Sequence, residues 1–148
     1  MENSKIAIIL AFKEIAAQKS IDKITVEKII SLANISRQTF YKYFADKYDL
    51  AFQMFSYDHS NSINPEDNFY ARQVSHLKML SDNRACYKNI MKDAHLQESF
   101  MQRRFEYCCG TVYDTVGKKS MTPTLKLVIE TWITGTERLF ERWVLNGC

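Results

Sequence analysis

Apolar side chains recur at steps of three and four residues along most of the chain, which is the spacing of an amphipathic helix. The first run predicts a helix over residues 4–19, and a second run predicts a helix of barely two turns over residues 26–33. The apolar positions of the two runs are Ile8, Ala11, Phe12, Ile15 and Ala16, then Val26, Ile29, Ile30 and Ala33. The chain is therefore expected to open with a long helix followed by a much shorter one.

Polar residues between these runs mark the helix ends. Thr25 is a good N-cap residue, and Asn34 ends the second helix because asparagine tolerates the left-handed conformation of a tight turn. Ser36 can cap a third short helix, RQTFYKYF, and Asp46 can cap a fourth that begins at Lys47. Two short helices joined by about four residues and braced by a longer one form a helix-turn-helix unit.

The third helix has two faces of different chemistry. Phe40 and Phe44 lie about 40° apart on one side, whereas Gln38 and Lys42 point nearly opposite. The two phenylalanines are expected to fix this helix to the first two, because two turns are not stable alone. The outward residues are Arg37, Gln38, Thr39, Tyr41, Lys42 and Tyr43. Arg37 suits guanine, Gln38 suits adenine, and hydroxyl and ammonium groups suit phosphate oxygens, so this face fits the major groove of DNA.

The rest of the chain is predicted to be helical as well. One helix continues over residues 47–60, and Pro65 is expected at the start of another that reaches about residue 81. A short helix should end near Asp93, and a longer one covers residues 95–116. With the last helix, these elements make eight.

The last helix carries an apolar stripe at alternating steps of four and three residues. The stripe consists of Leu125, Ile129, Trp132, Thr136, Leu139 and Trp143. Gly135 lies at its edge, and a glycine inside a helix usually permits the close approach of another backbone. Lys126, Glu130, Glu137 and Glu141 are expected on the opposite, polar side. A helix with so wide an apolar side must bury it against more than one neighbour.

Composition supports an all-α fold and narrows the setting. Of 148 residues, 46% are hydrophobic and 13% aromatic, and only four glycines and two prolines are available for tight turns. The formal net charge of +3 is too small to make the chain a polycation, so any nucleic acid must bind a local face. The four cysteines show no C-x-x-C spacing and no apolar run approaches the length of a membrane span, which favours reduced thiols, a cytoplasmic location and no membrane partner.

Catalytic patterns are weak. His59, His76 and His95 are scattered, and His95 with Glu98 is a single i, i+3 pair without the second pair that a dinuclear metal site needs. No G-x-S-x-G motif or phosphate-binding loop is present. We therefore expect no enzyme, no catalytic residues, no metal site and no cofactor.

The stretch TVEKIISLANISRQTFYKYFADKYDL resembles the DNA-binding domain of the TetR/AcrR transcriptional regulators. In that family a helix that starts with Thr, a turn and a run T-[hydrophobic]-Y-x-[HY]-F-x-x-K-x-x-L recur. The matching residues are Thr39, Phe40, Tyr41, Tyr43, Phe44, Lys47 and Leu50. The resemblance covers about residues 6–55. Ser20 departs from the pattern where a glycine is frequent, and Gln38 departs where a small residue is common.

The resemblance implies roles for single residues. Arg37 and Gln38 stand where base-reading residues stand, and the residues expected on the DNA backbone are Thr25, Thr39, Tyr41, Tyr43 and Lys47. An alternative remains for Tyr41 and Tyr43, which can also be packing residues, and for Arg37 and Lys42, which can belong to an ordinary solvated face.

For the whole chain, the resemblance implies a helix-turn-helix domain over residues 1–46 and a helical regulatory and dimerisation domain over 47–148. The apolar stripe with Gly135 would form a homodimer interface, although a purely intramolecular core helix is the alternative. Members of the family often have a further helix that pairs with the last one. A pocket for a small-molecule inducer could be lined by Phe100, Phe105, Tyr107 and Trp132, although such residues are mostly core.

The function expected from these features is a transcription regulator on a palindromic operator, with a repressor favoured over an activator. The alternative is a protein-interaction module or co-activator, derived from a helix-turn-helix protein, that has lost operator or ligand binding.

Overall fold

The computed structural model describes residues 2–147, and every regular element in that range is helical. The α-helices are α1 (Glu2–Gln18), α2 (Val26–Ala33), α3 (Arg37–Tyr43), α4 (Lys47–Ser62), α5 (Phe69–Asp82), α6 (Arg84–Lys92), α7 (Ala94–Val116) and α8 (Pro123–Asn146). Two 3-10 turns, η1 (Ile21–Lys23) and η2 (Lys118–Ser120), precede α2 and α8. The predicted all-α fold with an N-terminal helix-turn-helix is confirmed.

Side-chain caps fix where the helices begin. Thr25, Ser36 and Asp46 each accept a backbone amide of the first turn that follows, as their positions predicted. Asn34 ends α2 in the left-handed region at φ 51°, also as predicted. The prediction for Pro65 was wrong: α5 begins four residues later, capped by Asn68, whose side chain accepts the amide of Ala71.

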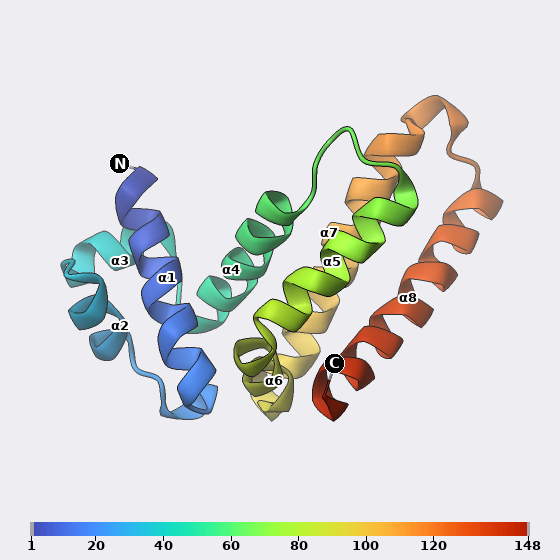
Figure 1. Cartoon of the computed structure of the whole chain (residues 1–148). Helices are drawn as coiled ribbons and strands as arrows, with labels where there is room; N and C mark the ends of the chain where they lie inside the picture. The colour runs from blue at the N-terminus through green and yellow to red at the C-terminus, as the bar shows by residue number, and fades with distance from the viewer. Residues whose placement is uncertain (1, 148) are drawn as a thin grey trace.

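The helices form an elongated molecule with the helix-turn-helix at one end (Figure 1). There α1, α2 and α3 lie together, α4 leads away from them, and α5, α7 and α8 run side by side at the other end. Helix α6 closes the arrangement by packing against α1 as well as against α7 and α8.

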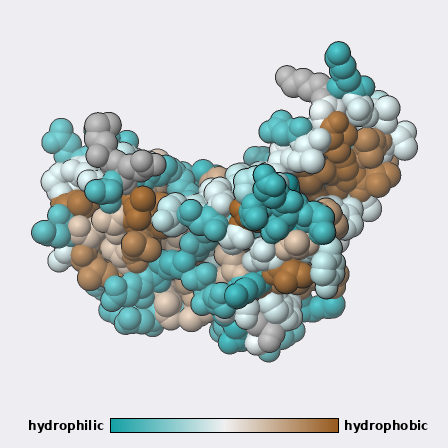
Figure 2. Space-filling view, turned by 45° about the horizontal axis from the view of Figure 1, so that its top comes forward, coloured by the Kyte–Doolittle hydropathy of each residue, from teal (hydrophilic) through white to brown (hydrophobic). Residues whose placement is uncertain are grey.

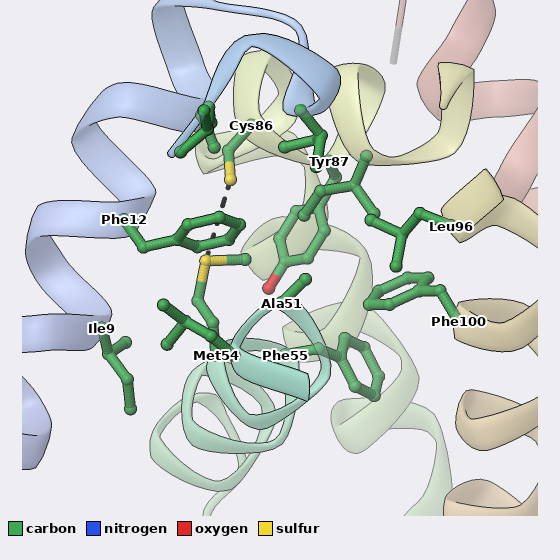
Figure 3. Close-up of a cluster of buried hydrophobic side chains, with 14 of the residues drawn as sticks. Ile9, Phe12, Ala51, Met54, Phe55, Cys86, Tyr87, Leu96 and Phe100 are labelled. Atoms are coloured by element: carbon green, nitrogen blue, oxygen red, sulfur yellow. Dashed lines mark hydrogen bonds between the residues drawn. The ribbon is translucent and has the colours of Figure 1, made fainter. Parts of the chain in front are cut away.

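One buried hydrophobic cluster runs through both ends of the molecule. Figure 3 shows Phe12 of α1, Met54 of α4, Tyr87 of α6 and Phe100 of α7 around a common centre. The predicted boundary between residues 46 and 47 coincides with the start of α4, but this core crosses it. The helix-turn-helix therefore packs directly against the helices that follow it and is not connected to them by a flexible linker alone.

A polar network joins α1, α4 and α6 beside this core. Asp58 on α4 is 7% exposed, and both of its carboxylate oxygens are hydrogen-bonded. Lys13 of α1 donates to one oxygen at 2.7 Å, and the Tyr87 hydroxyl of α6 donates to the other at 2.7 Å. Because a buried carboxylate is costly without such partners, the network favours one relative placement of the three helices.

A second link joins α7 to the start of α4. Arg103 of α7 donates to the Asp49 carboxylate at 3.0 Å, and its guanidinium carbon lies 4.1 Å from the centre of the Phe52 ring. Asp49 also accepts the backbone amide of Ala45, so its position depends on both the turn before α4 and on α7. Arg103 therefore connects α7 to the first turn of α4.

The orientation of α8 differs from the predicted one. Glu137 and Glu141 were expected on the solvent side, but they are 6% and 7% exposed and face α7. The reason is Arg104 of α7, which is fully buried and lies 2.7 Å from the Glu137 carboxylate. Glu141 accepts a hydrogen bond from Gln97. A buried guanidinium requires a carboxylate partner, so the acidic side of α8 turns inward.

His76, which is buried, and His59, which is half-buried, lie near Arg104 of this ion pair. The His76 ring is 5.2 Å from the His59 ring and 5.2 Å from that of Phe140, centre to centre. Burial lowers the pKa of His76 to about 3 and that of His59 to about 4, and the positive charge of Arg104 acts in the same direction. Both rings are therefore neutral in the folded protein near neutral pH.

We expect Glu137→Leu to lower the free energy of unfolding by about 3–5 kcal/mol, because Arg104 would remain buried without its carboxylate. Urea denaturation measures the change as a lower midpoint at an unaltered slope. Glu106→Gln, an exposed acid on α7, is the control and should stay within about 0.5 kcal/mol of the parent. Arg104→Met added to Glu137→Leu should recover most of the loss; a single variant as stable as the parent would contradict the ion pair's role.

We expect the folded state to lose stability as the pH falls below about 6.5, because the unfolded chain then binds protons on His59 and His76 that the folded chain excludes until about pH 4 and 3. Each histidine contributes a slope of about 1.4 kcal/mol per pH unit. His76→Phe keeps a ring between Phe55 and Phe140 and removes one of the two protons. Denaturation at several pH values measures the free energy of unfolding, whose slope against pH should be shallower in the variant by the contribution of one histidine. Equal slopes for parent and variant would contradict the prediction.

Candidate nucleic-acid interface

Helix α3 is held in place by its two phenylalanines. Phe40 and Phe44 are 0% and 1% exposed, and their ring centres are 5.7 Å apart. They belong to the buried cluster that also contains Ile8 and Phe12 of α1. The predicted inward face of this seven-residue helix is thus confirmed, and the packing supplies the stability that so short a helix lacks alone.

The other side of α3 faces away from the protein. Arg37, Gln38, Tyr41 and Lys42 are exposed, while Thr39 and Tyr43 are half-buried. The Thr39 hydroxyl lies 2.8 Å from that of Ser36, and the Lys42 ammonium nitrogen is 5.7 Å from the centre of the Tyr43 ring. This surface presents guanidinium, amide, hydroxyl and ammonium donors from one rigid helix.

Arg37 is held by two neighbours. Its guanidinium forms an ion pair with the Glu27 carboxylate of α2 and donates to the Tyr41 hydroxyl at 3.4 Å. The hydrogen bond that Arg37 donates to Glu27 raises the pKa of Arg37. The pKa of Glu27 is lowered by its own backbone amide and by the hydrogen bond that it accepts from Arg37. Both side chains of the ion pair are about 60% exposed, so water competes for it and it can be exchanged for another partner.

Thr25 and Lys47 form hydrogen bonds with other groups of the same chain. The Thr25 hydroxyl accepts the amide of Lys28 at 3.3 Å as the cap of α2, and it remains exposed. The Lys47 ammonium group donates to the carbonyl oxygens of Ile21, Asp22 and Ile24 at 2.8, 3.3 and 3.0 Å. These contacts connect the start of α4 to the chain around η1, and the phosphate contact of Lys47 stays a prediction.

The four residues predicted to line an inducer pocket lie in different parts of the helical region. Phe100 is 1% exposed in the main core, and Tyr107 lies edge-on to Phe52 with its hydroxyl 3.4 Å from a His59 nitrogen. Phe105 packs instead in a smaller cluster between α7 and α8, and Trp132 is 38% exposed at the surface.

Two hollows open on α7. A hollow of about 410 Å³ lies between α7 and the start of α4, lined by Ala45, Asp46, Tyr48, Asp49, Phe52, Leu96, Ser99, Phe100 and Arg103. A shallower groove of about 640 Å³ lies between α7 and α8, lined by Gln97, Glu98, Met101, Gln102, Phe105, Thr134, Glu137 and Arg138. Each contains one of the four predicted pocket residues, Phe100 in the first and Phe105 in the second.

The predicted interface stripe of α8 is divided between two sides. Ile129 is buried, Leu125, Thr136 and Trp143 are half-buried, and Trp132, Gly135 and Leu139 are exposed. Val128, which widens the predicted stripe, is 58% exposed, and Leu127, which the prediction did not include, is 64% exposed. A Cβ atom added at Gly135 would meet no other atom within 4 Å, so no neighbour inside the described chain requires this glycine. Figure 2 shows further apolar surface at the end formed by α7 and α8.

Sequence reasoning missed two ion pairs, one on the surface and one buried. Glu27 is ten residues from Arg37, and Arg104 is thirty-three residues from Glu137, so no local spacing signals either pair. Within residues 2–147 no helix is long and apolar enough to cross a membrane, and the described side chains form no group of three metal ligands. The side chain of His95, and with it the predicted His95–Glu98 pair, lies outside the described residues.

Comparisons with known proteins agree with this geometry. Residues 8–54 match the family described as bacterial regulatory proteins, tetR family. The HTH-type dhaKLM operon transcriptional activator DhaS of Lactococcus lactis subsp. lactis (strain IL1403) is 30% identical over 113 residues, which are 74% of this chain and span 60% of that protein. A solved structure of the dihydroxyacetone kinase operon activator DhaS shares the fold at a TM-score of 0.67 and 23% identity, covering 97% of this chain and 85% of the other. Residues 8–54, which contain the helix-turn-helix, are therefore a domain of the tetR family of bacterial regulatory proteins.

Proposed function

We propose that this protein is a DNA-binding transcription regulator that inserts α3 into the major groove of an operator. The observation that carries the proposal is the two-sided α3, in which Phe40 and Phe44 are buried while Arg37, Gln38, Tyr41 and Lys42 are exposed on the opposite side. A groove-reading helix needs this combination, since donors must be presented to base edges without conformational freedom.

Within this proposal, the exposed residues divide the work by chemistry. Arg37 can make two parallel hydrogen bonds to guanine, and Gln38 two to adenine. Lys42 and the hydroxyls of Tyr41 and Thr39 suit phosphate oxygens, which set the register of the helix without reading sequence. The start of α2 with Thr25 adds backbone amides, which favour an anion at a helix N-terminus.

The homodimer remains part of the proposal and is assigned to α8. Leu127, Val128 and Leu139 are all more than half exposed, and apolar side chains gathered on one helix are typical of a surface that another molecule covers. A two-fold axis through α8 would present two copies of α3 to DNA, which is why the operator should be palindromic. Residues 47–148 would then be the regulatory and dimerisation part.

The direction of regulation is proposed from the relative. Sequence reasoning favoured a repressor released by a small-molecule inducer, whereas DhaS is described as a transcriptional activator. This likeness supports activation as the first direction to test, with a reporter gene placed behind the bound operator. For an inducer, the hollow between α4 and α7 is the best placed of the two, because Arg103 and Asp49 line it and join the two helices there.

We expect Arg37→Ala to weaken binding to the operator by about five- to 150-fold and binding to scrambled DNA much less, because a bidentate guanine contact is lost. Lys42→Ala should weaken both equally and make the salt dependence of log K shallower by about 1 per protomer. The operator is obtained by selection from random DNA with the parent protein, and fluorescence anisotropy across a salt series measures both variants.

Both variants should fold as the parent does, since neither side chain is buried. Equal losses on operator and scrambled DNA for Arg37→Ala would make Arg37 a backbone contact. If selection enriches no sequence at all, operator binding fails and the protein-interaction alternative replaces it.

We expect Leu139→Glu to convert the dimer to a monomer of 17.4 kDa at micromolar concentration, because two carboxylates would be brought into an apolar contact. Sedimentation equilibrium measures the mass. Leu10→Glu, on α1, is the matched control, since Leu10 is 52% exposed and Leu139 54%. A Leu139→Glu dimer as stable as that of the control would place the interface elsewhere.

A further inference from the structure

Glu27 lies where an acidic side chain is least expected on a DNA-binding surface. It is in the first turn of α2, exposed, and its carboxylate pairs with Arg37, the residue best suited to read a base. Its own backbone amide and the Thr25 hydroxyl also act to lower the pKa of this carboxylate. One anion at the start of α2 thus holds the guanidinium of α3.

These donors are the groups that DNA would need. The amides and the hydroxyl at the start of α2 suit a phosphate, and the Arg37 guanidinium suits either a phosphate or the edge of guanine. The Glu27 carboxylate therefore occupies, within the free protein, positions where oxygen atoms of the ligand belong. Its charge also repels any phosphate that approaches the same place.

We propose that Glu27 determines specificity by competing with DNA for Arg37. The proposal rests on the operator binding proposed above. On DNA without the correct base, Arg37 stays with Glu27, and the carboxylate keeps phosphates away. On the operator, guanine offers two aligned acceptors, and Arg37 leaves the carboxylate for them. The repulsion of phosphates by the carboxylate acts on every sequence, whereas the contact of Arg37 with guanine is gained only on the operator.

The exposure of the pair makes this exchange feasible. A buried ion pair would hold Arg37 permanently, but Arg37 and Glu27 are 60% and 61% exposed, and such pairs are weak in water. A bidentate contact to guanine changes affinity by about five- to 150-fold, which is enough to win against an exposed carboxylate. A single phosphate oxygen, opposed by the negative charge of Glu27, is a poorer competitor. A repulsive element of this kind is a known way to obtain selectivity.

The Tyr41 hydroxyl and ring keep the released guanidinium in reach of the groove. Arg37 donates to that hydroxyl at 3.4 Å, and its guanidinium carbon is 5.5 Å from the centre of the Tyr41 ring. When Arg37 contacts guanine it must leave Glu27, but it can keep its contact with Tyr41. This asymmetry separates competition by Glu27 from a simple positioning role, in which removal of the carboxylate would harm operator binding.

The experiment compares the parent with Glu27→Gln, Arg37→Ala and the double variant, using the full chain, the operator selected by the parent and a scrambled duplex of equal length. Glu27→Gln should raise the affinity for scrambled DNA by about tenfold and that for the operator by less than about threefold, so the specificity ratio falls. On scrambled DNA, log K should depend on log salt more steeply by about 1 per protomer, as Arg37 gains a phosphate. Glu106→Gln, the same change on α7, should alter neither.

The double variant decides how Glu27 acts. With Arg37 replaced by alanine, Glu27→Gln should raise scrambled-DNA affinity by much less than it does in the parent. An equal increase in both backgrounds would mean general repulsion and would overturn the competition for Arg37. If Glu27→Gln lowers the affinity for the operator and leaves that for scrambled DNA unchanged, the competition is also overturned, and Glu27 instead positions Arg37 for binding. A parent that binds no duplex refutes operator binding itself, whereas a parent that binds its operator and a variant with the same specificity ratio refute only this inference.

Discussion

The junction of α1 with α4 and α6 is the contact on which the rest of the molecule depends. Helices α2 and α3 are too short to fold alone, and they take their support from α1. Helix α1 in turn is fixed to the helical part by Phe12 in the shared core and by Lys13 on Asp58. The position of the exposed face of α3 is therefore set by side chains that lie in other helices and far from it in sequence.

This arrangement explains which features the sequence could predict. Signals that act within a few residues were sufficient for the caps Thr25, Ser36 and Asp46, for the turn at Asn34 and for the inward pair Phe40 and Phe44. Each depends on one residue and its own turn of helix. The start of α5 was misplaced because proline is tolerated in a turn as well as at a first helical position, and here Asn68 supplies the cap.

Contacts between distant residues could not be predicted in the same way. The sequence indicated a phosphate contact for Lys47, which stays a prediction. It could not indicate the carbonyl oxygens of Ile21 and Ile24, which only the fold brings to this side chain. Glu27 and Arg37 each look like members of a solvated face until α2 and α3 are placed side by side. The pattern of polar positions shows which side chains can be exposed, but it contains no information about their partners.

Helix α8 shows what a buried charge does that apolar contacts cannot. A helix whose apolar residues cover about half of its circumference gains similar free energy in several rotations about its own axis, because the hydrophobic effect has no direction. The Arg104–Glu137 pair removes this degeneracy, since only one rotation brings the carboxylate to a guanidinium that water cannot reach. The ion pair therefore fixes the rotation of α8 about its own axis. By selecting the side that turns inward, it also decides which apolar residues are left on the outside.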